Sequence, residues 1–127
     1  MTFGSPRMLG DQLKTIVDNT PGAAGAILMG FDGIAVMQHV ADGAQGEVDL
    51  ESTAMEFSFR FMELRRAAQS LDMGDVQDIT VKGDRQTLVC RVLSDEYFVA
   101  VLLTESAFLG KGRFLLRASA PGLLADL

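Results

Sequence analysis

The alternation of apolar and polar residues divides the first part of the chain into a helix and a hairpin. Apolar residues at helical spacing predict a helix over residues 8–19, ended by Thr20-Pro21-Gly22. The small apolar run Ala23–Gly30 predicts a strand that is buried on both faces. Because the Asp-Gly pair of Phe31-Asp32-Gly33 favours a tight turn between two apolar runs, residues 34–40 are expected to return as a second strand.

The second part of the chain predicts a long helix, three strands and a closing helix, after a polar stretch over residues 41–49 that is expected to be flexible. The expected ranges are 50–71 for the long helix, 76–82, 87–93 and 97–103 for the strands, and 107–116, extended to Ala120, for a closing helix that ends before Pro121-Gly122. Residues 97–103 are mostly apolar, which predicts a central strand, whereas the mixed polarity of 76–82 suits a sheet edge. Since the sequence shows no repeat or linker, we expect one α+β domain, an α/β sandwich, over residues 1–127.

The long helix carries two apolar stripes on opposite sides. At about 100° per residue, one sector holds the residues expected to face the core, namely Leu50, Ala54, Phe57, Phe61, Leu64, Ala68 and Leu71. The opposite side holds Met55, Phe59 and Met62, joined by Arg66. Ser58 and Arg65 are expected on a flank between the two stripes. A helix that lies on a sheet needs only the first stripe.

The second stripe has two readings. It is either covered by the same chain or scattered surface hydrophobicity, or it is a protein–protein contact, which we favour because contiguous exposed apolar patches mark interaction sites. Three such side chains from each of two protomers contribute roughly 12 kcal/mol of gross burial energy, against an association cost on the order of 4–15 kcal/mol. The helix alone is therefore marginal. The edge strand, residues 76–82, is expected to add a second contact across a two-fold axis.

Charge and cysteine content exclude several classes of protein. The net charge of −6, with 11 basic residues scattered along the chain, disfavours binding to nucleic acid or to an anionic membrane surface. The single cysteine fits a reducing compartment. No apolar run reaches the roughly 20 residues that span a bilayer, and the first ten residues do not resemble a signal peptide. We expect a cytoplasmic protein without membrane insertion.

Candidate catalytic and ligand-binding features are weak. His39 and Cys90 do not predict a nucleophile–base pair or a metal site, and we interpret them as a half-exposed strand residue and a buried apolar residue. Gly110-Lys111-Gly112-Arg113 lacks the spacing of a phosphate-binding loop. Arg60, Arg65 and Arg66 are expected to be solvated or to pair along the helix, with an arginine finger as the alternative. We therefore expect no enzymatic activity and no cofactor.

The order and spacing of three segments resemble the roadblock/LC7 family, in its bacterial MglB-like branch. These segments are Pro21 to Gly33 (PGAAGAILMGFDG), the long helix, and Phe108 to Arg117 (FLGKGRFLLR). The resemblance implies a five-stranded antiparallel sheet of profilin-like topology, with the long helix on one face and the two terminal helices on the other. It also implies homodimers joined by the long helix and the third strand, with the dimer positions at Met55, Phe59, Met62, Arg66 and residues 79–82. Gly33 matches the family's hairpin glycine and Gly110 the glycine that opens the last helix.

Three functions are compatible with this resemblance. Members of the family regulate or scaffold small Ras-like GTPases, so the first hypothesis is a homodimeric, non-enzymatic module that acts on such a GTPase. The second is a scaffold subunit of a signalling or motility complex that leaves GTP hydrolysis unchanged. The third is a small-molecule sensor that uses the sheet face as a pocket.

Overall fold

The computed structural model describes residues 6–44 and 48–127 of the chain. The elements in chain order are α1 (Pro6–Asp18), β1 (Ala23–Gly30), β2 (Ala35–Val40), the short 3-10 helix η1 (Asp42–Ala44), α2 (Leu50–Ser70), β3 (Asp78–Lys82), β4 (Thr87–Val92), β5 (Tyr97–Leu103) and α3 (Leu109–Ala125). The predicted order of helices and strands is confirmed. Within the polar stretch 41–49, residues 42–44 form η1, while residues 45–47 lie outside the described part of the chain.

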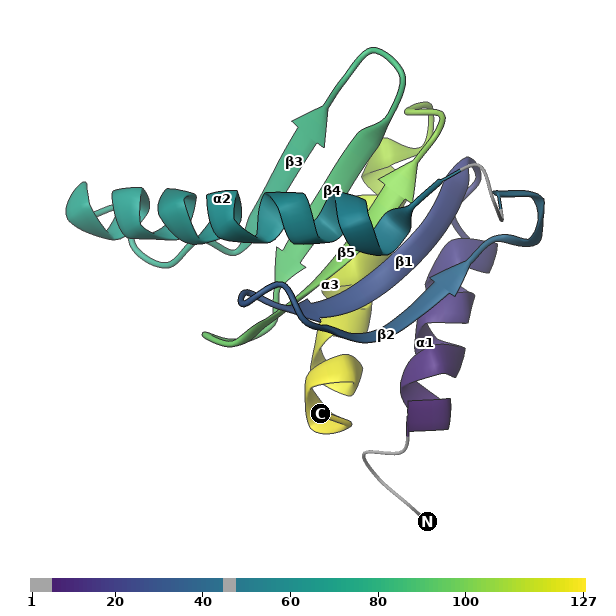
Figure 1. Ribbon diagram of the computed structural model, residues 1–127, viewed down its shortest axis with the longest axis horizontal. Helices are drawn as coiled ribbons and strands as arrows, with labels where there is room; N and C mark the ends of the chain where they lie inside the picture. The colour runs from purple at the N-terminus through teal and green to yellow at the C-terminus, as the bar shows by residue number, and fades with distance from the viewer. Residues whose placement is uncertain (1–5, 45–47) are drawn as a thin grey trace.

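The five strands form one antiparallel sheet in the order β2-β1-β5-β4-β3 (Figure 1). β5 lies at its centre and β1 beside it, as their continuous apolar sequences predict, and both are almost fully buried. β3 is one edge of the sheet and β2 is the other. The predicted fold class, α+β with a five-stranded antiparallel sheet, is therefore confirmed.

The helices cover the two faces of the sheet unequally (Figure 1). α1 and α3 pack together on one face, where their core side chains Leu13, Ile16, Leu116 and Leu123 are at most 1% exposed. α2 covers the other face, where Phe61 forms an edge-to-face contact with Phe98 of β5 at 5.4 Å between ring centroids. Because side chains alternate along each strand, the sheet contributes to two separate apolar cores, one on each of its faces.

The expectation that Leu64 and Leu71 face the core is wrong. The C-terminal turns of α2 project beyond the edge strand β3, so that no sheet lies beneath them (Figure 1). Leu64 is 49% exposed and Leu71 is 72% exposed. Ser58, by contrast, is fully buried, and its hydroxyl donates a hydrogen bond to the Met55 carbonyl at 2.6 Å. The core-facing sector of α2 is therefore shorter than the sequence stripe and rotated toward Ser58.

The closing helix continues through the proline that was expected to end it. α3 contains Pro121 and extends to Ala125. Because its last turn buries Leu123 completely and places Asp126 where it accepts a hydrogen bond from Gln12 Nε2 at 2.6 Å, tertiary contacts outweigh the backbone hydrogen bond that proline cannot make. Gly122 lets α1 approach closely, since a Cβ atom there would lie 3.0 Å from Gln12 Oε1.

No helix within residues 6–44 and 48–127 is long and apolar enough to cross a membrane.

Candidate functional site

The eight residues expected to form an interface fall on two separate surfaces. The helix residues Met55, Phe59, Met62 and Arg66 lie on the flank of α2 that faces the β1–β2 and β4–β5 turns. The strand residues Ile79, Thr80, Val81 and Lys82 lie at the open edge of the sheet. The structure therefore does not bring the two groups together within one chain.

The first surface is built by the β1–β2 turn against α2. Gly33 adopts a φ of +86°, a backbone conformation that glycine tolerates and other residues rarely do. The turn lies so close to the helix that a Cβ atom on Gly33 would be 3.2 Å from Met55 Cγ and 3.7 Å from Phe59 Cζ. The contact leaves Met55 44% and Phe59 52% exposed. The second stripe of α2 is thus only partly covered by its own chain.

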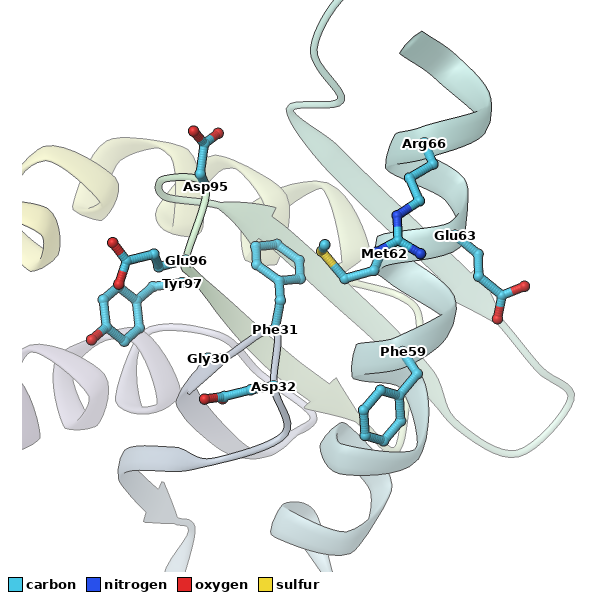
Figure 2. Close-up of a pocket in the computed structure, with 10 residues that line it drawn as sticks. All are labelled: Gly30, Phe31, Asp32, Phe59, Met62, Glu63, Arg66, Asp95, Glu96 and Tyr97. Atoms are coloured by element: carbon cyan, nitrogen blue, oxygen red, sulfur yellow. The ribbon is translucent and has the colours of Figure 1, made fainter. Parts of the chain in front are cut away.

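A hollow of about 650 Å³ opens between this flank of α2 and the two turns (Figure 2). Its apolar side chains include Phe31, Phe59 and Met62. Acidic side chains surround them from both turns and from the helix, namely Asp32, Glu63, Asp95 and Glu96. Arg66 reaches into the same space. The hollow therefore combines an apolar floor with a predominantly acidic rim, which suits a protein contact better than a buried small molecule.

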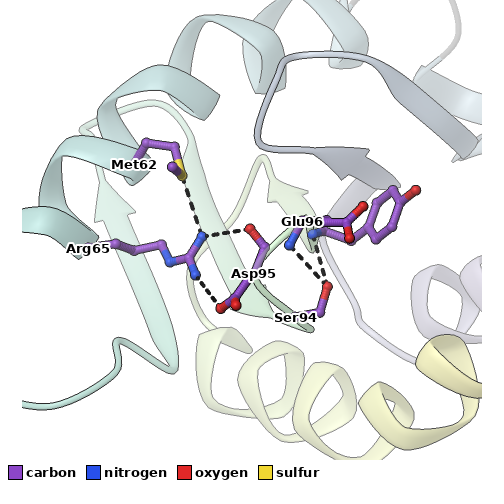
Figure 3. Close-up of polar contacts among 6 residues, drawn as sticks. Met62, Arg65, Ser94, Asp95 and Glu96 are labelled. Atoms are coloured by element: carbon purple, nitrogen blue, oxygen red, sulfur yellow. Dashed lines mark hydrogen bonds and ion pairs between the residues drawn. The ribbon is translucent and has the colours of Figure 1, made fainter.

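Arg65 holds one wall of the hollow in place (Figure 3). Its guanidinium group donates hydrogen bonds to the Asp95 carbonyl at 3.1 Å, to Asp95 Oδ1 at 3.2 Å and to Met62 Sδ at 3.4 Å. The same group lies 4.4 Å above the centre of the Phe31 ring. Sequence reasoning missed this role, because helical periodicity places Arg65 on a polar flank and contains no information about the β4–β5 turn.

Replacing Arg65 by alanine is expected to lower the free energy of unfolding by about 1–3 kcal/mol, through loss of charge-assisted hydrogen bonds, packing and the contact with Phe31. Asp95→Ala is expected to cost less than about 1 kcal/mol, because the Asp95 side chain is fully exposed and its backbone carbonyl remains. Urea denaturation of both variants measures the difference. Equal effects would show that the ion pair, and not the burial of Arg65, stabilises this wall.

The second surface lies under the projecting end of α2. A largely apolar groove of about 470 Å³ is lined there by Leu64, Leu71 and Met73 together with Ile79 of β3. Met73 is 74% exposed, the highest exposure among the large apolar side chains of the described residues. Leu64 and Leu71 belong to the apolar stripe predicted to face the core, and in the structure they line this groove instead.

β3 is tied to β4 and α3 by ion pairs of Asp78, and its other backbone edge is open. Asp78 forms ion pairs with Arg91 of β4 at 3.8 Å and with Arg113 of α3 at 3.6 Å. In the part of the chain that the structure describes, β3 pairs only with β4, so one side of its backbone has no ladder partner. Such an edge is a template for pairing with another strand.

The candidate chemical groups are far apart or inert. His39 and Cys90 lie on β2 and β4, which are separated by two strands. Burial raises the pKa of the Cys90 thiol well above its ordinary value, so this side chain is a poor nucleophile. Within residues 6–44 and 48–127 there is no group of His, Cys, Asp and Glu side chains arranged to hold a metal ion. Gly110-Lys111-Gly112-Arg113 forms the first turn of α3, with Gly112 buried.

Several solved structures resemble this chain. MglC from Myxococcus xanthus is 34% identical with a TM-score of 0.66, and the alignment covers 92% of this chain and 97% of that protein. The gliding protein MglB from Thermus thermophilus is 20% identical with a TM-score of 0.83, covering 99% and 95%. A roadblock/LC7 domain from Streptomyces avermitilis is 23% identical with a TM-score of 0.69, covering 91% and 97%. No family model and no curated protein sequence matches the chain.

Proposed function

Because the chain belongs to the roadblock/LC7 family, in the branch that contains MglB and MglC, we propose that it is a cytoplasmic, homodimeric and non-enzymatic module that regulates or scaffolds a small Ras-like GTPase. The observation that carries this proposal is the division of α2 into two exposed apolar surfaces. One lies beside the open sheet edge and serves the dimer. The other lies beside the hairpin turns and serves a partner protein.

The dimer contact we propose is self-complementary. If β3 pairs with its copy in antiparallel register about Thr80, Ile79 lies opposite Val81 of the other protomer, and Asp78 lies opposite Lys82. Each protomer then contributes one apolar and one oppositely charged cross-strand pair, and the open backbone edge is satisfied. The projecting end of α2 would extend over the partner's sheet, which covers Leu64, Leu71 and Met73.

The size of the apolar contribution supports this arrangement. Burial of the exposed parts of Leu64, Leu71 and Met73 is worth about 1–1.5 kcal/mol for each side chain, or about 6–9 kcal/mol over two protomers. Association costs on the order of 4–15 kcal/mol. The burial energy of these three side chains only about balances the cost of association, so strand pairing is a necessary part of the proposed dimer.

The partner surface we propose consists of Met55, Phe59, Met62 and Arg66. Phe59 is half-exposed on the apolar floor of the hollow, where its ring is accessible to a second protein. Methionine, phenylalanine and arginine are the residue types enriched at the centres of interfaces. A dimer presents this surface twice.

A hydrolysis assay with a Ras-like GTPase from the same genome tests the proposal. Addition of the protein is expected to accelerate GTP hydrolysis at least about tenfold, which corresponds to about 1.4 kcal/mol of activation free energy. Phe59→Glu is expected to abolish the effect, because it places a charge within the apolar contact.

Leu124→Glu serves as the matched control, since Leu124 is 44% exposed on α3, away from both surfaces. Binding of the GTPase without acceleration would favour the scaffold over the regulator. Absence of binding, or equal loss in both variants, would contradict the proposed surface.

A further inference from the structure

The acidic rim of the hollow is largely unpaired. Among the described residues, Asp95 is bound by Arg65, whereas Asp32, Glu63 and Glu96 form no ion pair. Four carboxylates around the hollow face two guanidinium groups, those of Arg65 and of Arg66, which leaves a formal excess of two negative charges. A ligand for this hollow must therefore bring positive charge together with apolar surface.

α3 carries a surface of the matching chemistry. Lys111, Arg113, Phe114 and Arg117 are all exposed, and successive rotations of about 100° place them within one half of the helix surface. We call these four residues the basic face. Phe114 is 54% exposed and lies 5.8 Å from the guanidinium group of Arg117. Asp78, the carboxylate that reaches Arg113, is shared with Arg91 and so neutralises the face only in part.

One copy of the chain cannot join the two surfaces. The hollow lies beside α2 on one face of the sheet, and α3 packs on the opposite face with Leu116 and Leu123 turned inward. The basic face therefore points away from the molecule. Only a second molecule can place a basic, aromatic helix in the hollow.

We propose that the acidic hollow of one copy receives the basic face of α3 of another copy. Phe114 would rest on the apolar floor formed by Phe31, Phe59 and Met62, and Lys111 and Arg117 would face the carboxylates of Glu63 and Glu96. The hollow, at about 650 Å³, is large enough for an aromatic ring and a basic side chain together. The contact is head-to-tail, so it leaves a free hollow at one end and a free basic face at the other, and it can propagate.

This assembly is independent of the proposed β3 dimer and uses the proposed partner surface a second time. A copy bound in the hollow covers Phe59 and Met62. Assembly and binding of a GTPase at this flank would therefore exclude each other, and assembly would store the protein in a form that cannot engage its partner.

The effect of salt distinguishes this contact from general aggregation. Each chain carries a net charge of −6, so two copies repel each other overall, and salt would strengthen an association driven by apolar surface alone. A contact between an acidic hollow and a basic face is instead weakened by salt. We expect light scattering to give a weight-average mass at least about twofold above the dimer at about 10 mM NaCl, where the Debye length is about 30 Å, and the dimer mass at about 1 M, where it is about 3 Å.

Charge reversal on either surface is expected to abolish the growth in mass. Glu63→Lys with Glu96→Lys makes the hollow basic, and Lys111→Glu with Arg117→Glu makes the helix face acidic. None of these four side chains forms an ion pair within the described residues, so the substitutions are expected to leave the fold intact. Each double variant alone should remain a dimer at low salt.

An equimolar mixture of the two double variants provides the decisive measurement. The basic hollow of the first matches the acidic helix face of the second, and the acidic hollow of the second matches the basic helix face of the first. The mixture should therefore regain the mass of the wild-type assembly. Glu51→Lys with Asp84→Lys is the control for the hollow variant, because it changes the net charge in the same direction and by the same amount at exposed positions outside the hollow, and it should assemble like the wild type.

A wild-type protein that stays at the dimer mass at low salt would overturn the proposal, as would a mixture that fails to assemble or a control that loses assembly. Failure of the β3 dimer is a separate result. In that case the same salt-dependent growth should start from the monomer mass.

Discussion

Phe61→Ala is expected to lower the free energy of unfolding by about 3–5 kcal/mol, as large-to-small substitutions of buried aromatic residues do. Phe61 is 1% exposed, stacks on Phe57 at 5.8 Å and meets Phe98 edge-to-face at 5.4 Å. The substitution removes both ring contacts and opens a cavity between α2 and the centre of the sheet. For a domain of this size the melting temperature should fall by about 10–20 °C at a fixed protein concentration.

Two further phenylalanines of the same helix provide graded controls. Phe57 is partly buried at the margin of the core, so Phe57→Ala should cost about half as much as Phe61→Ala or less. Phe59→Ala should stay within about 1 kcal/mol of the wild type, because Phe59 is 52% exposed. If Phe61→Ala does not fold, Phe61→Leu gives a smaller loss that can still be measured. Equal losses of unfolding free energy in Phe57→Ala, Phe59→Ala and Phe61→Ala would contradict the packing of α2 described above.

Leu71→Glu is expected to convert the proposed homodimer into a monomer. Leu71 is 72% exposed in one chain and lies in the groove beside β3, where the proposed dimer covers it. A glutamate there buries an unpaired charge in each protomer, which should raise the dissociation constant at least about 100-fold, or about 2.7 kcal/mol. Light scattering at micromolar concentration and about 1 M NaCl, where the head-to-tail assembly is dissociated, reports the change as a halved mass.

The choice of variant separates dimerisation from folding. Because Leu71 is exposed in the single chain, the substitution should change the stability of the monomer by no more than about 0.5 kcal/mol. Ile34→Glu is the matched control, since Ile34 is 66% exposed beside β2, at the opposite edge of the sheet. A Leu71→Glu protein that remains dimeric, or an Ile34→Glu protein that also dissociates, would contradict an interface at β3.

Most of the fold was predictable because its signals are local. Strands buried on both faces have continuous apolar sequences, as in β1 and β5, and the edge strand β3 shows mixed polarity. The Asp-Gly pair between two apolar runs predicted the β1–β2 hairpin. The end of α3 was not predictable in this way, because the burial of Leu123 against α1 and the sheet, which overrides Pro121, is a contact between distant parts of the chain.

The sequence predicted the helix residues of the candidate site but not the turns that complete it. Met55, Phe59 and Met62 were recognised as a second apolar stripe, and the structure leaves Met55 and Phe59 exposed and Met62 partly buried. The hollow beside them could not be predicted, because its other walls come from the β1–β2 and β4–β5 turns. Arg65 shows the same limit, since its partner Asp95 is thirty residues away in the chain.

The sequence by itself determined that α2 carries more apolar surface than one sheet face can cover, because the helical period is a property of neighbouring residues alone. Only the tertiary structure decided which apolar residues remain uncovered. Leu64 and Leu71 share the period of the core residues, yet they are exposed. The C-terminal turns of α2 project past β3, where the sheet ends. The position at which a sheet ends depends on the number and order of its strands, and no local pattern contains that information.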